Sequence, residues 1–257
     1  FNRSVLETLK LLCWQPDIIH VNDWHSALIP LYLNTLYKKD PFFKKISSLL
    51  TIHNVGYQGD FSKKSGDLTG IPQSAWPDLK ETGSEGFNFL ASGIMASDYV
   101  NTVSQTYANE IRTSSELGHG METLLAQRKK KFSGIVNGVD ETVWNPETDE
   151  HIPFNYSIKN LTDKEENKKA LLKRVGLPYK SDVPVFGLIS RLVPHKGLQL
   201  LIEALPELVK LDAQFVILGT GERKIQASLS KARKQYSKKF SATFGFNDTL
   251  AHLIEAG

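Results

Sequence analysis

Short apolar runs alternate with longer amphipathic stretches along the chain. Runs of about four to eight apolar residues indicate buried strands, and apolar residues at helical spacing indicate helices that cover a sheet. The pattern predicts strands over residues 18–21, 49–52, 99–103, 133–136, 183–190, 214–218 and 242–246. It predicts helices over residues 24–37, 87–96, 105–112, 121–131, 163–175, 197–211, 222–235 and 248–255, with Ser104 as a helix cap. Residues 54–83, rich in Gly, Asp, Ser and Pro, are expected to form a long loop with short helices.

The order of these elements predicts the class of fold. Strands that alternate with helices form parallel sheets with both faces covered. The alternation stops over residues 140–182, which contain prolines and a charged run, and then resumes. We therefore predict an α/β chain of two doubly wound domains, residues 1–138 and 139–257. The second begins with a linker, packed by Trp144 and Pro146, whose helix over 163–175 docks on that domain.

Composition narrows the class of protein. The chain is 40% hydrophobic and 23% charged with a net charge of +3, which argues against disorder and does not demand nucleic acid or a membrane as partner. Cys13 is the only cysteine, so a disulfide-stapled secreted module is excluded and a reducing compartment is favoured. No apolar run reaches the ~20 residues of a membrane helix. No signal peptide follows Phe1, and both ends look cut, so we expect a piece of a longer protein.

Chemistry in a doubly wound fold is expected beyond the carboxyl ends of the strands. Arg191 and Lys196 lie five positions apart there, in the loop between a buried strand and a helix. Two cations near a helix N-terminus can hold a diphosphate and stabilise negative charge as it departs. The alternative is two ordinary cations on a solvated loop. Gly219 and Gly221 suit phosphate binding at the same edge, although a simple tight turn explains them about as well.

The first domain offers a different set of groups at its strand ends. Asp23 follows the first strand, where it can be a ligand-facing carboxylate or simply a helix cap. His53 ends the second strand, where it can be catalytic or structural. Asn54 and Tyr57 follow in the same loop and suit a hydroxyl-rich ligand. No Cys/His cluster has metal-ligand spacing, so a zinc site is not expected.

Seven segments together resemble the bacterial glycogen synthases and plant starch synthases. They are PDIIHVNDWH (16–25), TIHNVGYQG (51–59), TVSQTYA (102–108), GME (120–122), GIVNGVD (134–140), WNP (144–146) and SRLVPHKG (190–197). They occur in the family's order and spacing through nearly the whole chain. The resemblance implies the GT-B arrangement, with two Rossmann-like domains facing a cleft. Both would be incomplete here: the end of an acceptor-side domain (1–138), then the linker and start of a nucleotide-binding domain (139–257).

The resemblance also implies a reaction and roles for single residues. The family transfers glucose from ADP-glucose to the non-reducing end of an α-1,4-glucan, retains the anomeric configuration and needs no metal or other cofactor. Arg191 and Lys196 would hold the distal diphosphate, and His53 would lie at the donor glucose. The remaining implied contacts are Asp23 and Asn137 at the glucosyl part of the site, Gly219 and Gly221 at the nucleotide, and Phe246 stacked on adenine. Asn54 and Tyr57 join this binding set.

Retention normally uses a carboxylate nucleophile, and no obvious buried carboxylate pair occurs at these strand ends. The mechanism usually given for the family is a front-face substitution, in which an oxygen of ADP helps deprotonate the acceptor.

Two family segments, K-x-G-G-L near the start and E-P-C-G-L with its important glutamate, are absent. We therefore expect these 257 residues alone to be inactive.

Two other functions stay open. One is a GT-B glycosyltransferase that uses UDP-glucose, since many of these share the Arg and Lys pair. The other is a non-catalytic glucan-binding module, in which Arg191 and Lys196 would have no task. The expected location is the bacterial cytoplasm, or the plastid stroma for a plant protein.

Overall fold

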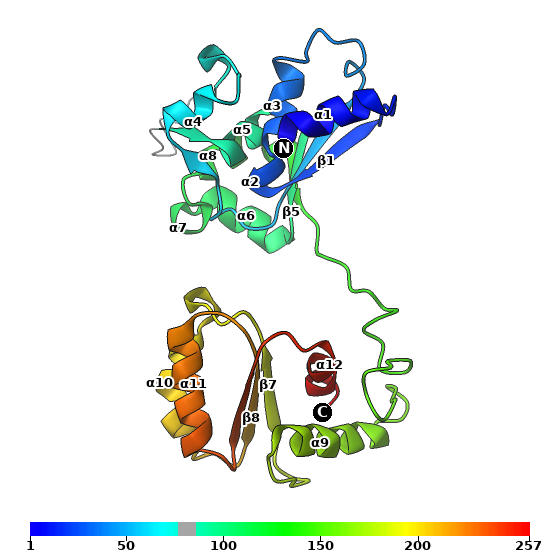
Figure 1. Cartoon of the computed structure of the whole chain (residues 1–257), viewed down its shortest axis with the longest axis vertical. Coiled ribbons are helices and arrows are strands. Elements are labelled where there is room, and N and C mark those ends of the chain that lie inside the picture. The colour runs from blue at the N-terminus through cyan, green and yellow to red at the C-terminus, as the bar shows by residue number, and fades with distance from the viewer. Residues whose placement is uncertain (77–85) are drawn as a thin grey trace. The chain divides into compact units, whose positions relative to one another are not determined.

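The computed structural model describes residues 1–76 and 86–257, which form two compact units, Phe1–Gly138 and Val139–Gly257 (Figure 1). Each unit contains a parallel sheet with helices packed against it. The α/β fold predicted from the alternation of elements is thereby confirmed. No helix among the described residues combines the length and the apolar character needed to cross a membrane.

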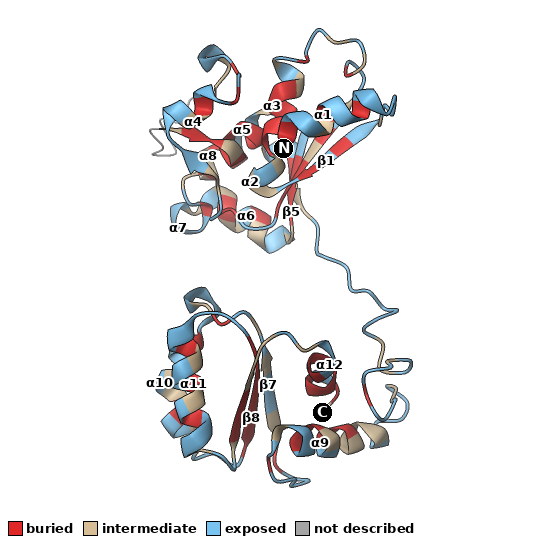
Figure 2. Ribbon diagram, viewed as in Figure 1, coloured by how far each residue is buried: buried red, intermediate tan, exposed pale blue. Residues whose placement is uncertain are grey.

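The first unit is built on a four-stranded parallel sheet in the order β1-β2-β5-β6. These strands are β1 (Ile18–Asn22), β2 (Ser47–Ile52), β5 (Tyr99–Thr102) and β6 (Phe132–Gly134). The helices are α1 (Asn2–Leu11), α2 (Asp23–Ser26), α3 (Leu28–Asn34), α5 (Phe89–Ala96), α6 (Gln105–Thr113), α7 (Ser115–Gly118), α8 (Glu122–Gln127) and the 3₁₀ helix η3 (Lys129–Lys131). One hydrophobic core joins the sheet to α1, α3, α5, α6 and α8 (Figure 2).

The predicted loop over residues 54–83 contains short elements. A two-stranded antiparallel ribbon pairs β3 (Asp60–Phe61) with β4 (Phe87–Asn88), and α4 (Lys63–Asp67) and the 3₁₀ helix η1 (Gln73–Ala75) follow β3 along the chain. Residues 77–83 of the predicted loop lie outside the described residues. The short helices expected there are confirmed for the described part, whereas the ribbon was not predicted.

The second unit is a three-stranded parallel sheet in the order β7-β8-β9, made of β7 (Val185–Ile189), β8 (Gln214–Gly219) and β9 (Phe240–Phe244). Its helices are α9 (Thr162–Val175), the 3₁₀ helix η4 (Pro194–Lys196), α10 (Leu198–Leu208), α11 (Arg223–Gln235) and α12 (Asp248–Ala256). Side chains of β8 alternate between two cores. Phe215 and Ile217 pack with α10 and α11, whereas Val216 and Leu218 pack with α9 and α12, so helices cover both faces (Figure 1).

The linker before α9 is anchored to α12. The Trp144 ring stacks on the His252 ring at 3.8 Å between centroids, which confirms that Trp144 packs the linker. The linker begins in a turn in which Asp140 accepts hydrogen bonds from the hydroxyl and backbone N–H of Thr142, and these bonds lower the pKa of the Asp140 carboxyl. The helix predicted over 163–175 does dock on this unit, because Leu171 and Leu172 are buried beneath it.

Several predicted boundaries are wrong for identifiable reasons. The helix predicted over 24–37 is two helices, α2 and α3, and the new start places Pro30 in the first turn of α3, where a missing N–H costs nothing. The helix predicted from residue 87 begins at Phe89, since the Asn88 side chain caps it by accepting from the Ala91 N–H. The strand predicted over 242–246 ends at Phe244, because Gly245 takes a φ of +124°.

Two further expectations also fail. The strand before Arg191 is not buried, because β7 lies at an edge of its sheet and Phe186 and Ile189 are exposed. Asp23 is not a helix cap, since α2 follows Asn22 and Asp23 itself adopts a left-handed φ of +53°. Ser104, in contrast, does cap α6 by accepting from the Tyr107 N–H.

Candidate active site

The carboxyl ends of β1 and β2 meet at one edge of the first sheet, where Asp23 and His53 contact each other. The His53 backbone N–H donates to Asp23 Oδ1 at 2.8 Å, and His53 Nε2 lies 2.9 Å from Asn22 Oδ1. Both bonds bridge the two strand ends. Asp23 adopts a left-handed backbone conformation, which is uncommon for a residue other than glycine. Such strained residues cluster at functional sites. The strand ends therefore fix the backbone and the ring of an exposed histidine.

The loop after His53 is held from several sides. Asn54 Oδ1 accepts from the Gly56 N–H at 2.9 Å, and Gln58 Nε2 donates to the His119 carbonyl at 2.8 Å. Gly59 has a φ of +61°, and a Cβ on it would lie 2.3 Å from the Trp24 ring. Tyr57 is exposed in the middle of this braced loop. The loop thus presents Tyr57 beside His53 without burying either side chain.

Asn137 follows β6 at the same edge of the first sheet and is exposed. β6 ends in Gly134, whose Cβ position would lie 2.0 Å from the Ser104 carbonyl oxygen. The Ile135 N–H still donates to the Thr102 carbonyl of β5 at 2.8 Å, and residues 135–138 form an exposed segment without helix or strand. Asn137 therefore shares an edge with Asp23 and His53.

A cavity of about 270 Å³ lies beyond the carboxyl ends of the strands in the second unit. Three loops supply its walls: Ile189–Arg191 after β7, Leu218–Thr220 at the end of β8, and Gly245–Asp248 after β9. Arg191, Gly219 and Phe246 all line it. Its size is close to the ~300 Å³ at which ligand pockets begin, and the Phe246 side chain is 91% exposed at its margin.

Gly219 and Gly221 are explained by a close contact between two of these loops. A Cβ on Gly219 would lie 1.9 Å from the Ser190 carbonyl oxygen, and one on Gly221 would lie 2.3 Å from the Leu192 carbonyl oxygen. The loops are also joined by a bond from the Leu192 N–H to the Thr220 carbonyl at 2.8 Å. Both glycines therefore allow the loop that carries Arg191 to lie directly against the end of β8.

The two predicted cations occupy one short connection. Arg191 lines the cavity, and Lys196 ends η4 immediately before Gly197, which has a φ of +72° and precedes α10. Both are exposed, and among the described residues neither side chain forms an ion pair or a hydrogen bond. Their charges are therefore not neutralised by an acidic side chain of the described part of the chain.

The predicted residues form one group in each unit. Asp23, His53, Asn54, Tyr57 and Asn137 lie at the edge of the first sheet, and Arg191, Lys196, Gly219, Gly221 and Phe246 lie at the edge of the second. Asn22, whose side chain holds the His53 ring, was not selected from the sequence. The signal for it was its position at the end of β1.

Two family models and several known proteins match this chain. A family model described as "Starch synthase catalytic domain" matches residues 1–127, and one described as "Glycosyl transferases group 1" matches residues 169–256. The glycogen synthase of Thermosipho melanesiensis is 47% identical over the whole chain, and that of Thermosipho africanus is 44% identical. The chain covers 53% of each of these proteins, so it spans about half the length of the curated relatives it matches.

A solved structure is similar over the same extent. The catalytic domain of starch synthase IV from Arabidopsis thaliana, bound to ADP and acarbose, matches with a TM-score of 0.89 and 34% identity. The match covers 100% of this chain and 53% of that one.

Proposed function

Because the chain belongs to the family of bacterial glycogen synthases and plant starch synthases, we propose that the protein carrying it transfers glucose from ADP-glucose to the non-reducing end of an α-1,4-glucan, with retention. The chain has the fold of GT-B glycosyltransferases. ADP in the similar starch synthase supports an adenine nucleotide as the leaving group. The proposed reaction needs no cofactor besides this donor.

The cavity at the carboxyl edge of the second sheet is the observation that carries the proposal. It combines a cation that has no ion-pair partner in the described part of the chain, a closely packed glycine turn and an exposed aromatic ring, supplied by Arg191, Gly219 and Phe246. A nucleoside diphosphate needs a positive charge at its phosphates and a flat apolar surface at its base. A glucan-binding module would have no use for the unpaired cations.

The proposed mechanism assigns the charge stabilisation to Arg191 and Lys196. The bond between glucose C1 and the diphosphate oxygen breaks, and negative charge develops on ADP. Fixed cations stabilise that charge in the transition state. The acceptor hydroxyl oxygen bonds to C1 on the same face, and its proton passes to an oxygen of the departing phosphate. This route retains the configuration without a carboxylate nucleophile.

The groups at the edge of the first sheet are assigned to the sugar. His53 is proposed to contact the donor glucose, and the bonds from Asp23 and Asn22 fix its backbone and ring. Asn54 and Tyr57 are exposed in the loop that follows His53, Asn137 is exposed after β6, and all three can hydrogen-bond to sugar hydroxyls. Asp23 thus acts largely through His53. The proposed location is the bacterial cytoplasm, by likeness to the two Thermosipho glycogen synthases named above, or the plastid stroma for a plant protein.

The test is Lys196→Ala in the complete polypeptide that carries this sequence. We expect kcat to fall by ~10²-fold or more, the scale of losing one preorganised stabilising group. Lys210→Ala is the matched control, because Lys210 is an exposed lysine of the same unit that pairs with Glu207 on the helix surface. An unchanged kcat in Lys196→Ala would refute the assigned role.

Donor choice is tested separately by competition between ADP-glucose and UDP-glucose on the unaltered protein. We expect ADP-glucose to be used in preference. A preference for UDP-glucose would support the other glycosyltransferase reading, and the absence of ADP binding would support a glucan-binding module.

A further inference from the structure

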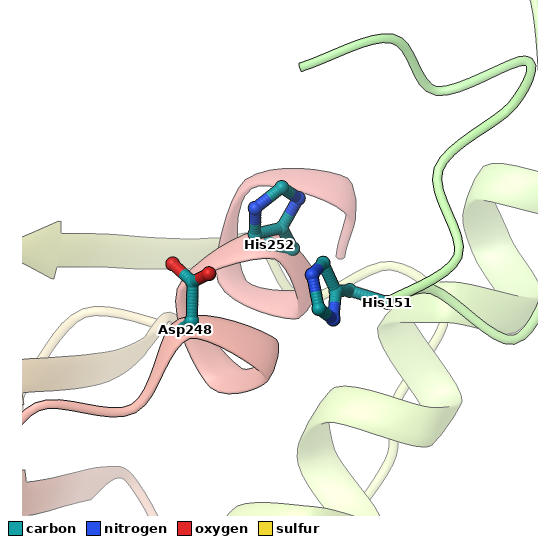
Figure 3. Close-up of side chains that lie close together, drawn as sticks. All are labelled: His151, Asp248 and His252. Carbon is teal, nitrogen blue, oxygen red and sulfur yellow. The ribbon is translucent and has the colours of Figure 1, made fainter. Parts of the chain in front are cut away.

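Two histidines and an aspartate converge in the second unit. His151 comes from the linker, and Asp248 and His252 lie four residues apart on α12. One potential ligand atom from each residue lies within 4.8 Å of the corresponding atoms of the other two (Figure 3). The fold brings these groups together from positions about 100 residues apart in the sequence, which is why no spacing pattern reveals them.

His252 is the fixed member of this cluster. It is 1% exposed, the Trp144 ring is stacked on it with an interplanar angle of 6°, and its Nδ1 lies 2.7 Å from Asp149 Oδ2. An ionised carboxylate only accepts hydrogen bonds, so Nδ1 carries a proton, and in the neutral imidazole Nε2 then presents a lone pair. Nε2 is buried and has no hydrogen-bond partner among the described residues. A buried acceptor without a partner is costly, and it calls for an explanation.

The Asp149–His252 pair has the form of a carboxylate that orients a metal-binding imidazole. Such a partner fixes the tautomer of the ligating histidine and increases its basicity. The other two side chains, His151 and Asp248, are exposed; His151 Nδ1 lies 3.4 Å from Thr249 Oγ1, and the His151 ring centroid lies 4.5 Å from that of His252. Bonds of about 2.0–2.1 Å to zinc place tetrahedral ligand atoms roughly 3.3 Å apart, so small rotations of these two side chains toward Nε2 close the site.

We propose that His151, Asp248 and His252 bind a divalent transition metal ion of the zinc class, with Asp149 orienting His252. Two imidazole nitrogens and one carboxylate oxygen are ligands that Zn²⁺ accepts, and a fourth position stays open to water. The ion would fasten the linker at His151 to α12, next to the stacking of Trp144 on His252. The proposed glucosyl transfer assigns no step to this ion, although Asp248 also lines the cavity of the second unit, and the site is proposed independently of that function.

The experiment measures Zn²⁺ affinity by titration calorimetry and follows Co²⁺ substitution by its visible absorption. All proteins carry Cys13→Ser, because the exposed Cys13 thiol would bind these ions on its own. We expect one Zn²⁺ per chain and a tetrahedral Co²⁺ spectrum. His151→Ala should weaken the affinity by about 10-fold or more, and His25→Ala, which removes an exposed histidine outside the cluster, should leave it unchanged. Asp248 is not substituted in this experiment, because it also lines the cavity that we propose to bind the nucleotide.

Asp149→Asn supplies a second and more specific test. The Oδ1 atom of the new asparagine can still accept from the backbone N–H of His151, as Asp149 Oδ1 does at 2.8 Å. The amide NH₂ facing Nδ1 would move the imidazole proton to Nε2, which then cannot ligate. We expect metal affinity to fall about 10- to 100-fold and the metal-induced rise in the thermal unfolding midpoint to disappear. No Zn²⁺ binding to the Cys13→Ser protein, or affinities of His151→Ala and Asp149→Asn that equal that of the Cys13→Ser protein, would overturn the site.

Discussion

Phe246 is an aromatic residue with 91% of its surface exposed, at the margin of the cavity in the second unit. Leaving a large apolar ring in water is unfavourable unless a ligand covers it. The ring follows Gly245, whose φ of +124° turns the chain away from β9. The backbone therefore holds Phe246 outside the core and beside the cavity, where it can stack on a base.

Phe246→Ala should weaken ADP binding by about 1–3 kcal/mol, which is the contribution of one base–aromatic stack. Phe246→Tyr keeps the ring and should bind ADP as the parent does. Titration calorimetry with ADP in the absence of glucan measures both variants. Equal affinity of the Ala variant and the parent would show that the base lies elsewhere.

Asn22 is predicted to act through His53. Asn22→Ala removes the oxygen that lies 2.9 Å from His53 Nε2 and lets the ring rotate. We expect kcat to fall about 10-fold or more, because misplacement of a reacting group by about 1 Å can cost 10²-fold, while KM for the donor changes little. Asn22→Asp retains an acceptor oxygen and should keep a rate near that of the parent. Steady-state kinetics on the complete polypeptide measure kcat and the KM for the donor in both variants. A kcat in Asn22→Ala equal to that of the parent would contradict the proposed role of Asn22.

Sequence reasoning at the residue scale succeeds where a residue's position in its strand is enough. Arg191 and Gly219 each follow a predicted strand, Phe246 is the last residue of another, and parallel strands bring such positions to one edge. It fails where a role depends on a distant partner. Asn22 is recognised only through its contact with His53, and His252 only through Asp149, which lies 103 residues away.

At the scale of elements, the strands of both sheets follow from apolar runs, since a buried parallel strand needs little else. The helix α1 is absent from the prediction: Leu11 at its end and Leu12 directly after it are exposed apolar residues, and they blur the face that buries Leu6 and Leu9. The break between α2 and α3 follows from Ser26, whose hydroxyl hydrogen-bonds to the Asn22 backbone, and from Pro30. Hydrogen bonds from side chains to the backbone and the position of a proline cannot be deduced from the spacing of apolar residues.

The contact between the end of β8 and the loop after β7 gives a prediction about stability. Gly219→Ala places a methyl group 1.9 Å from the Ser190 carbonyl oxygen, so the loop that carries Arg191 must move. We expect a loss of about 1–3 kcal/mol in the free energy of unfolding, as for overpacking elsewhere, together with weaker ADP binding. Urea denaturation followed by circular dichroism measures the first effect.

Gly138→Ala is the control for that measurement. A Cβ on Gly138 meets no atom within 4 Å, so the free energy of unfolding should change by no more than ~0.5 kcal/mol. If both alanine variants were equally stable, the close approach of the two loops would not require glycine at residue 219.

At the scale of the whole chain, the hydrophobic cores belong to separate units. One core lies entirely within residues 1–138, and the other two lie on the two faces of the second sheet. The change in composition after Gly138 is visible in the sequence because a linker that makes few contacts needs few apolar residues. The packing of the linker by Trp144 is predicted from the sequence, but its partner His252 is not, because the last helix supplies it.

The segment between the two units should therefore be the first point of proteolysis. Ile135, Val136 and Val139 are 59%, 73% and 71% exposed in a stretch without helix or strand, and locally open backbone is what a protease cleaves. Thermolysin cuts before aliphatic residues, so brief digestion should give two fragments that meet between residues 134 and 139. Each fragment has its own core and should keep its helical circular dichroism after separation. Mass spectrometry identifies the cut, and first cuts within α9 or the strands of either sheet would show that the units do not unfold independently.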